Sequence, residues 1–188
     1  MPSSIYDNLP VIIKEIMITK PNSILDIGIG FGKMGHLCRE YLEVWNSRYK
    51  KEDWKLKIDG IEIFKDYVNP ATIFYYDDIF IGDATKILPY LDSYDLIIAN
   101  DVIEHIEKSA AENLLKMIIQ KSSKKIIMSI PLGDNWLGAN GAYAKINPAE
   151  MHISSWTIEE LKSLDNFSTL YEFCGVRGRI GLFVYEKK

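Results

Sequence analysis

Cysteine, histidine and long apolar runs are the features that this sequence has least of. It holds two cysteines, Cys38 and Cys174, and three histidines. The two cysteines lie far apart and show no metal-ligand spacing, so the pattern gives neither a disulfide framework nor a metal site. We therefore expect two packing thiols in a reducing compartment and no bound metal.

The sequence also lacks membrane-spanning, targeting and strongly basic segments. No apolar run reaches the ~18 residues that a spanning helix needs, and residues 1–4 have neither the basic nor the apolar part of a signal peptide. Lys50-Lys51 and Lys124-Lys125 are only doublets, and the formal net charge is −4. These absences disfavour a nucleic-acid backbone as partner and predict a cytoplasmic protein without a membrane span.

What remains is an ordinary globular composition, with 188 residues, 47% of them hydrophobic and 26% charged. That length fits one domain with a sizeable core, so we expect residues 1–188 to form a single domain. An apolar stripe from Leu9 to Met17 predicts a helix within residues 1–20, before Pro21, packed beside the first strand or over a ligand.

The most informative stretch runs from Ser23 to Gly35. Its first apolar residues are typical of a strand that is buried on both faces, and Gly28, Gly30 and Gly32 then let the backbone turn tightly and approach a ligand. From Met34 to Trp45 the apolar residues return at helical spacing. The stretch therefore predicts a strand, a glycine loop and a helix.

Three further strands are expected at 56–63, 75–84 and 94–100, and each has a polar residue at or next to its end: Glu62, Asp83 and Asn100. A helix at 109–121 and a fifth strand at 124–130 complete a βαβα pattern. This pattern predicts an α/β fold with a Rossmann-like, doubly wound and mostly parallel sheet. Ligands of such sheets bind at the carboxyl ends of the strands, where the polar residues are expected to converge.

The remainder of the chain departs from that pattern. Residues 131–155 form a glycine-rich loop that is too long for a simple connection, which indicates a substrate loop. Thr157 and Glu160 then make the capping box of a helix. Strands expected at 168–173 and 182–186 make a C-terminal antiparallel hairpin, giving about seven strands in all.

These residues together resemble the class I S-adenosylmethionine-dependent methyltransferases. The likeness covers the chain from about Leu9 to Ser129 and rests on residues 26–32, Glu62, Asp83-Ala84 and 94–105. The run Asp101-Val102-Ile103-Glu104-His105 is similar to the branch of that family that methylates small molecules, quinones and lipids among them.

The resemblance implies a role for each matching residue. The loop glycines line the methionine part of S-adenosylmethionine, Asp26 orients its amino group, and Glu62 holds the two ribose hydroxyls. The adenine meets Ile63, Asp83 and Ala84, and the acceptor enters at Asp101. The cofactor-binding residues implied in this way are Asp26, Gly28, Ile29, Gly30, Gly32, Glu62, Ile63, Asp83, Ala84, Asn100, Asp101 and Val102.

Two other functions stay open. Residues 30–35 also fit the G-x-G-x-x-G pattern of an NAD(P)-dependent oxidoreductase. Against that alternative, Asp26 stands just before the first glycine, where a carboxylate would repel a pyrophosphate but suit a cationic sulfonium compound. The third function is a non-catalytic module that binds S-adenosylmethionine.

Methyl transfer from a sulfonium requires mainly proximity and alignment, with a base for a weakly acidic hydroxyl. The catalytic candidates are Asp101, His105 and His152. His105 alternatively fixes the Glu104 loop or caps the next helix, and His152 alternatively anchors its loop by a hydrogen bond. His36 reads as a surface or packing histidine.

Residues 147–156 resemble a motif of uncharacterised methyltransferases that accompany glycan-building enzymes. This resemblance makes a saccharide hydroxyl one candidate for the small-molecule acceptor. Aromatic rings suit the walls of such an acceptor pocket. The aromatic candidates for that wall are Tyr6, Trp136, Tyr143 and Trp156, and each of them alternatively packs in the core or in a loop.

Overall fold

The computed structural model describes residues 5–164, 167–175 and 177–187, and its centre is a seven-stranded sheet of order β3-β2-β1-β4-β5-β7-β6. Strands β1 to β5 are parallel, β7 is antiparallel to β5, and β6 is antiparallel to β7. This arrangement confirms the expected Rossmann-like sheet and its C-terminal hairpin. The strands are β1 Ser23–Ile27, β2 Lys57–Glu62, β3 Asp78–Ile81, β4 Tyr94–Asn100, β5 Ser122–Pro131, β6 Phe167–Gly175 and β7 Gly178–Glu186.

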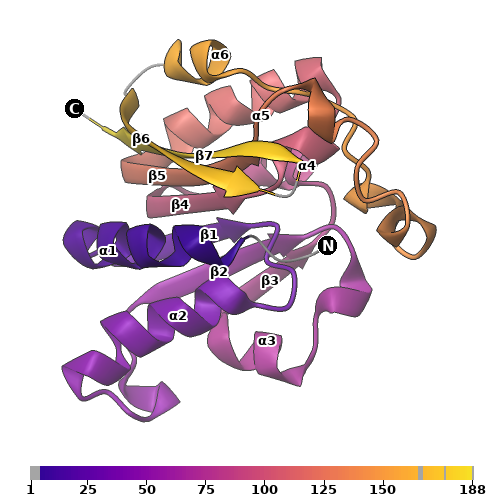
Figure 1. Ribbon diagram of the computed structural model, residues 1–188. Helices are drawn as coiled ribbons and strands as arrows, with labels where there is room; N and C mark the ends of the chain where they lie inside the picture. Colours follow the sequence, from indigo (N-terminus) through magenta and orange to yellow (C-terminus); the bar gives the residue numbers. More distant parts are fainter. Residues whose placement is uncertain (1–4, 165–166, 176, 188) are drawn as a thin grey trace.

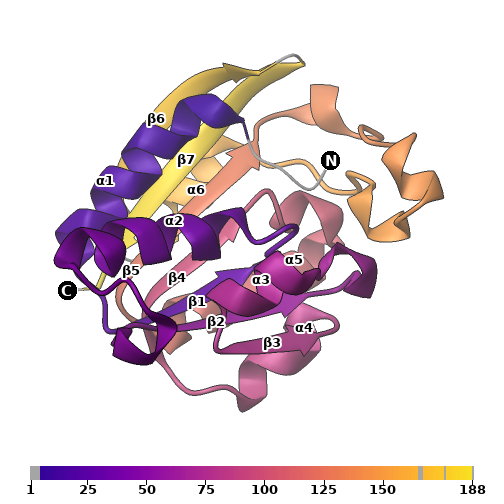
Figure 2. The same ribbon diagram turned by 90° about the horizontal axis from the view of Figure 1, so that it is seen from below.

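Helices cover both faces of the sheet (Figure 1). The helices are α1 Leu9–Thr19, α2 Lys33–Leu42, α3 Pro70–Tyr75, α4 Ala84–Ile87, α5 Lys108–Lys121 and α6 Ile158–Lys162. The first three lie on one face and the last three on the other, as the view turned by 90° also shows (Figure 2). None of the helices in the described part of the chain is long and apolar enough to cross a membrane.

The core is double because the central strands are apolar on both sides. On one face Ile24, Ile58 and Ile98 pack with α1 and α2, and on the other Leu25 and Ile97 pack with α5 and α6. Burial of such side chains is the main favourable term in folding. Helix α1 contacts α2 and β5, so the N-terminal helix packs on the sheet rather than over the carboxyl ends of the strands.

The register of the central strands determines where the site lies. Ile27 pairs with Ile61 of β2 and with Ala99 of β4. Consequently the residues that follow each strand meet at one edge, and Gly28, Glu62 and Asn100 become neighbours there. Strand β3 adds its end to the same edge through the pairing of Glu62 with Ile81.

Two expected elements need correction. The third strand begins at Asp78, not at Tyr75, because helix α3 starts at Pro70 after a capping box on Asn69 and includes Tyr75. The buried Arg39 side chain then holds the turn, since its Nε donates to the carbonyl oxygen of Tyr75 at 2.9 Å. The strands of the hairpin are longer than expected, and Gly181 lies within β7 instead of in the link.

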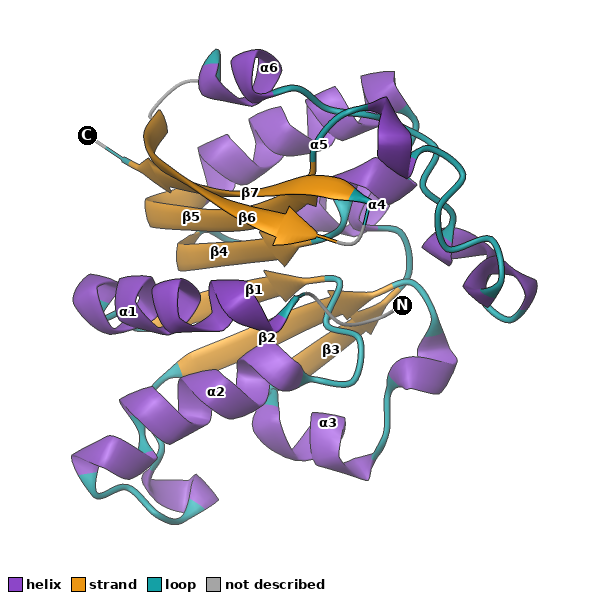
Figure 3. Cartoon of the chain, in the orientation of Figure 1, coloured by secondary structure: helices purple, strands orange, loops and turns teal. Residues whose placement is uncertain are grey.

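Residues 132–155 follow β5 and contain three short 3-10 helices between loops (Figure 3), and Pro131, expected in the loop, ends the strand. In Figure 1 this orange segment extends beyond the arrowheads of the parallel strands. Its far end is fixed to the segment after β4, because the amides of Ile153 and Ser154 both donate to the carbonyl oxygen of Glu104. The loop is therefore docked beside the carboxyl edge of the sheet.

Candidate active site

A cleft lies at the carboxyl ends of β1, β2 and β4, with Asp26, Glu62, Asn100 and Asp101 in its lining. The amides of Gly28 and Ile29 both donate to the carbonyl oxygen of Ile61, at 2.9 and 3.3 Å, and turn the chain back over β2. The sequence expectation that polar strand ends converge on one crevice agrees with this arrangement.

The glycine loop needs glycine for two separate reasons. Gly28, Gly30 and Gly32 have φ values of +76°, +52° and +83°, which residues with a side chain rarely adopt. In addition, a Cβ on Gly28 would lie 2.7 Å from a methyl carbon of Val102. The loop therefore lies so close to Val102 that position 28 has no room for a Cβ atom.

Asp26 sits beneath this loop in a buried hydrogen-bonded group. Its Oδ2 accepts a hydrogen bond from the Tyr76 hydroxyl at 2.5 Å, and the Tyr76 oxygen in turn accepts one from the Gly35 amide at 3.0 Å. Burial raises the pKa of Asp26 to about 7, while the Tyr76 hydrogen bond opposes that rise. A nearby cation would therefore convert Asp26 to its charged form.

Glu62 closes the other side of the loop. Its Oε2 accepts a hydrogen bond from the Gly30 amide at 2.8 Å, and its Oε1 accepts one from the Phe64 amide at 2.9 Å. Burial raises the pKa of this carboxyl as well. Each carboxylate oxygen has two acceptor sites, so both oxygens keep capacity for a further donor.

Asp83 and Ala84 stand at the junction of β3 and α4. The Oδ1 of Asp83 accepts hydrogen bonds from the amide and hydroxyl of Thr85, at 2.9 and 2.7 Å, and so caps α4. Ile63, at the mouth of the cleft, has 54% of its surface exposed. All three residues line the cleft, as the resemblance implied.

Asn100 and Asp101 end β4 with a strained turn. Asp101 has a φ of +55°, a left-handed conformation that non-glycine residues seldom take. The Ser129 hydroxyl donates to its Oδ1 at 2.9 Å, and the Asn100 Oδ1 accepts from the Ser129 amide at 3.1 Å. Such strain often accompanies a functional position, and here it directs Asp101 along the cleft wall.

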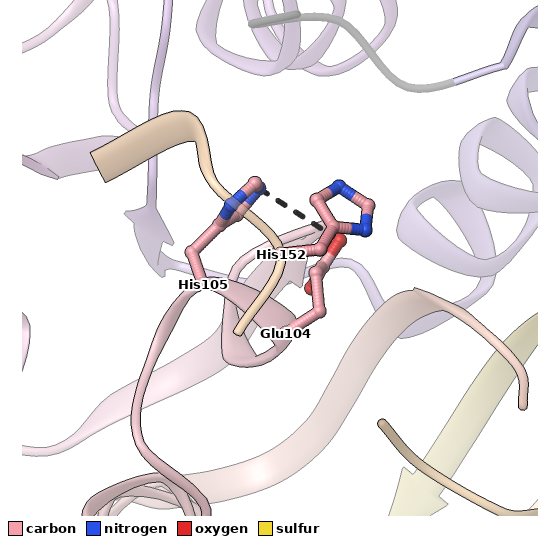
Figure 4. A group of neighbouring side chains, drawn as sticks. All are labelled: Glu104, His105 and His152. Carbon is pink, nitrogen blue, oxygen red and sulfur yellow. Dashed lines mark ion pairs between the residues drawn. The ribbon is translucent and has the colours of Figure 1, made fainter. Parts of the chain in front are cut away.

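Beyond Asp101 lies a group formed by Glu104, His105 and His152 (Figure 4). The His105 ring meets the His152 ring edge to face at 4.7 Å between centroids, and its Nδ1 bonds the Met151 carbonyl oxygen at 3.1 Å. The Nε2 of His152 lies 2.9 Å from the Asn140 amide nitrogen. Burial lowers the pKa of His105, and it lowers that of His152 to about 4.

The two histidines differ in their access to the cleft. Among the described residues that form its lining, His105 is present and His152 is not. His152 stands behind His105, where it contacts Trp136 in a stacked arrangement with 6.2 Å between ring centroids. Both loop-fixing hydrogen bonds that the sequence left open as alternatives are present.

Lys33 at the start of α2 and Tyr67 line the cleft, although the sequence had not indicated either of them. Asn147 and Glu150, which belong to the motif at 147–156 but were given no role there, line the cleft as well. The Tyr67 hydroxyl donates to Oε1 of Glu150 at 2.9 Å and ties the loop to the segment after β2. No local sequence pattern predicts this contact, because Tyr67 and Glu150 are 83 residues apart.

The aromatic residues expected as an acceptor wall lie elsewhere. Trp156 is 2% exposed and belongs to the core on the α5 face, and Tyr6 is 78% exposed. Neither Trp136 nor Tyr143 lines the described cleft. Trp156 thus takes the core-packing alternative, with Lys108 Nζ 3.7 Å from its ring centroid.

Comparisons with known proteins relate this fold to solved structures. No protein-family profile matches the chain, and no curated protein matches it in sequence. A SAM-dependent methyltransferase from Archaeoglobus fulgidus is 15% identical with a TM-score of 0.65, over 96% of this chain and 94% of that one. Magnesium protoporphyrin IX methyltransferase from Synechocystis, solved with bound SAH, is 11% identical with a TM-score of 0.66, over 97% and 83%.

A candidate O-methyltransferase from Nostoc punctiforme is 18% identical with a TM-score of 0.59, over 96% of this chain. The chain spans 56% of the length of that protein. These likenesses show that the chain has the fold of the S-adenosylmethionine-dependent methyltransferases. Activity has to be argued from the cleft itself.

Proposed function

We propose that this chain transfers a methyl group from S-adenosylmethionine to a small-molecule acceptor. The observation that carries the proposal is the charge of the cleft, whose lining includes the carboxyl groups of Asp26, Glu62, Asp83, Asp101 and Glu150. S-adenosylmethionine presents a sulfonium and an ammonium group to its site, and both are attracted by carboxylates. The solved methyltransferases of the same fold support the assignment.

The described residues fit each part of this cofactor. Asp26 and the three loop glycines would hold the methionine end, because a Cβ on the loop would fill the space beside Val102. Glu62 retains acceptor capacity for ribose hydroxyls. The adenine would lie between Ile63 and Ala84 with Asp83 at its edge, and Ile29 and Asn100 would close the pocket.

The same carboxylates argue against the runner-up, an NAD(P)-dependent oxidoreductase. A dinucleotide site places a pyrophosphate at the start of the helix after the glycine loop. Here the buried Asp26 lies below that loop and Glu62 bonds to the Gly30 amide, a donor that a pyrophosphate would need. A doubly charged anion would meet two carboxylates, which is unfavourable in a partly buried cleft.

The transfer itself is an in-line displacement. The acceptor heteroatom forms a bond to the methyl carbon and the carbon–sulfur bond breaks. The electron pair of the broken bond stays on the sulfur, which becomes a neutral thioether. A hydroxyl acceptor also gives its proton to a base. Asp101 and His105 line the acceptor end and are the proposed bases, and His152 supports them from behind the wall.

The first acceptor class to test is a saccharide hydroxyl. Incubation with S-adenosylmethionine labelled in its methyl group, against separate panels of sugars, amines and thiols, measures the transfer directly. We expect labelled product from the sugar panel, and we expect that its formation requires Asp101. If only amines or thiols were labelled, the proposed acceptor class would be wrong, and the proposed methyl transfer would stand.

A further inference from the structure

We propose that Glu104, His105 and His152 bind a divalent transition-metal ion at the acceptor end of the cleft. Glu104 and His105 belong to the short helix Ile103–His105, and the docked loop brings His152 beside them. Each side chain offers one ligand atom, and these atoms lie within 4.8 Å of one another. Figure 4 shows the three side chains converging from two segments of the chain.

Glu104 gives the strongest reason to expect an ion. Its side chain is 1% exposed, and neither carboxylate oxygen has a hydrogen-bond partner among the described residues. A buried carboxylate without a partner is costly in either protonation state, since the protonated form would hold an O–H without an acceptor. A cation between Glu104 and the two histidines would supply the partner that the carboxylate lacks.

The histidines have the lone pairs that such an ion needs. The Nδ1–H of His105 donates to the Met151 carbonyl oxygen, which leaves the lone pair on Nε2, 3.9 Å from Oε1 of Glu104. His152 has its Nε2 against the Asn140 side-chain amide, and its buried Nδ1 has no partner within the described part of the chain. Metal-bound histidines characteristically hydrogen-bond through their second nitrogen in this way.

The side-chain nitrogen of Asn140 lies 2.9 Å from Nε2 of His152, an orientation that puts the ring proton on Nδ1. Metal binding through Nδ1 requires the flipped amide, whose oxygen accepts from Nε2–H and leaves the lone pair of His152 on Nδ1. The backbone around His152 is also held firmly, because its amide donates to the Ala139 carbonyl and its carbonyl accepts from the Gly138 amide. The ligand is therefore positioned before any ion arrives.

The donor set indicates the kind of ion. Two imidazoles and one carboxylate suit Zn²⁺, Mn²⁺ or Fe²⁺ better than Mg²⁺ or Ca²⁺, which prefer oxygen donors. Three protein ligands leave a coordination position open, as in catalytic rather than structural sites. The negative charges of Asp101 and Glu150, which act on Glu104 across the cleft, further favour a cation.

A role for the ion in catalysis rests on the proposed methyl transfer. With its open position towards the cleft lined by His105, the ion would bind an acceptor oxygen and lower the pKa of that hydroxyl. His105 would then hold the ion instead of taking a proton, and Asp101 would remain as the base. This arrangement favours oxygen acceptors and, among them, diols that can supply two ligands.

Calorimetric titration of chelator-treated protein with Mn²⁺ and Zn²⁺, in the absence of S-adenosylmethionine, tests the site directly. The expected result is one ion per chain, with affinity at least about 100-fold weaker in Glu104→Gln and His152→Ala, since even outer-shell partners contribute 10- to 100-fold. The matched controls are Glu112→Gln and His36→Ala, which change exposed residues and should bind like the parent protein. Absence of binding, or equal affinity in all four variants, would overturn the inference.

Folding of each variant is checked by its melting temperature without metal. If Glu104→Gln fails to fold, His105→Gln and His152→Ala carry the same test, because each removes one proposed ligand and leaves Glu104 unchanged. Titration of the same samples with S-adenosylmethionine separates the two proposals. Cofactor binding without ion binding removes only the metal site, and ion binding without cofactor binding removes only the methyl-transfer function.

Discussion

The Tyr76 hydroxyl donates a hydrogen bond to the buried Asp26 carboxylate at 2.5 Å, although 50 residues separate the two side chains. This contact joins the end of helix α3 to the central strand, and the Gly35 amide completes it from helix α2. Tyr76 thereby positions the carboxylate that we assign to the amino group of the cofactor. The Tyr76 hydroxyl therefore links helix α3, strand β1 and helix α2 around the glycine loop.

Replacing Tyr76→Phe should therefore weaken both stability and cofactor binding. The change leaves a buried carboxylate oxygen and the Gly35 amide without partners, which costs about 1–3 kcal/mol. It also removes the hydrogen bond that lowers the pKa of Asp26, so more Asp26 is neutral at pH 7. Urea denaturation measures the first effect and calorimetry the second, with Tyr90→Phe, at a ring 90% exposed, as the control.

Cofactor affinity should fall as the pH drops through about 7. Asp26 has a raised pKa of about 7 in the free protein, and a bound cation favours the charged carboxylate and lowers that pKa. Binding below pH 7 must therefore release a proton, and affinity declines by up to about tenfold per pH unit. Titrations in two buffers of different ionisation enthalpy measure the released proton, and a flat profile that matches Asp26→Asn would contradict the assignment.

Gly28→Ala should abolish cofactor binding, because the added methyl group clashes with a neighbour in addition to straining the backbone. The added Cβ meets Val102 at 2.7 Å, in addition to the cost of about 1–2 kcal/mol for a side chain at φ +76°. Gly138→Ala is the control, because φ is +70° there but no atom lies within 4 Å of the new Cβ. Equal losses of melting temperature and of affinity in the two variants would argue against a tight approach at Gly28.

His152→Ala should abolish turnover and leave cofactor affinity nearly unchanged. His152 does not line the described cleft, but it contacts His105, which does. Initial rates with labelled cofactor, set beside a cofactor titration, distinguish the two effects, and His36→Ala serves as the control. Unchanged turnover would remove His152 from the proposed machinery.

The residues that the sequence predicted well are those placed by local rules. Strand β1 and its glycine loop follow from burial on both faces and from the need for positive φ, and Thr157 forms its capping box as expected. The parallel register then brings Glu62 and Asn100 to the same edge. The parallel sheet, its antiparallel hairpin and the meeting of polar strand ends at one edge could therefore be predicted from the sequence.

The residues that it missed are placed by contacts between distant segments. Tyr75-Tyr76 reads as the start of a strand, yet Asn69 caps a helix that includes Tyr75, and Arg39 fixes the turn that follows. The group of Glu104, His105 and His152 was equally hidden, because its third member comes from a loop about fifty residues away. Trp156 was misplaced because an aromatic ring beside a loop fits a core as well as a pocket wall.

Calorimetric titration of the purified protein with S-adenosylmethionine, S-adenosylhomocysteine and NAD distinguishes a methyltransferase from an oxidoreductase. We predict that the first two bind with one molecule per chain, that Asp26→Asn and Glu62→Gln weaken both, and that NAD does not bind. Binding of NAD, with neither of the sulfur compounds bound, would contradict the account and restore the oxidoreductase assignment.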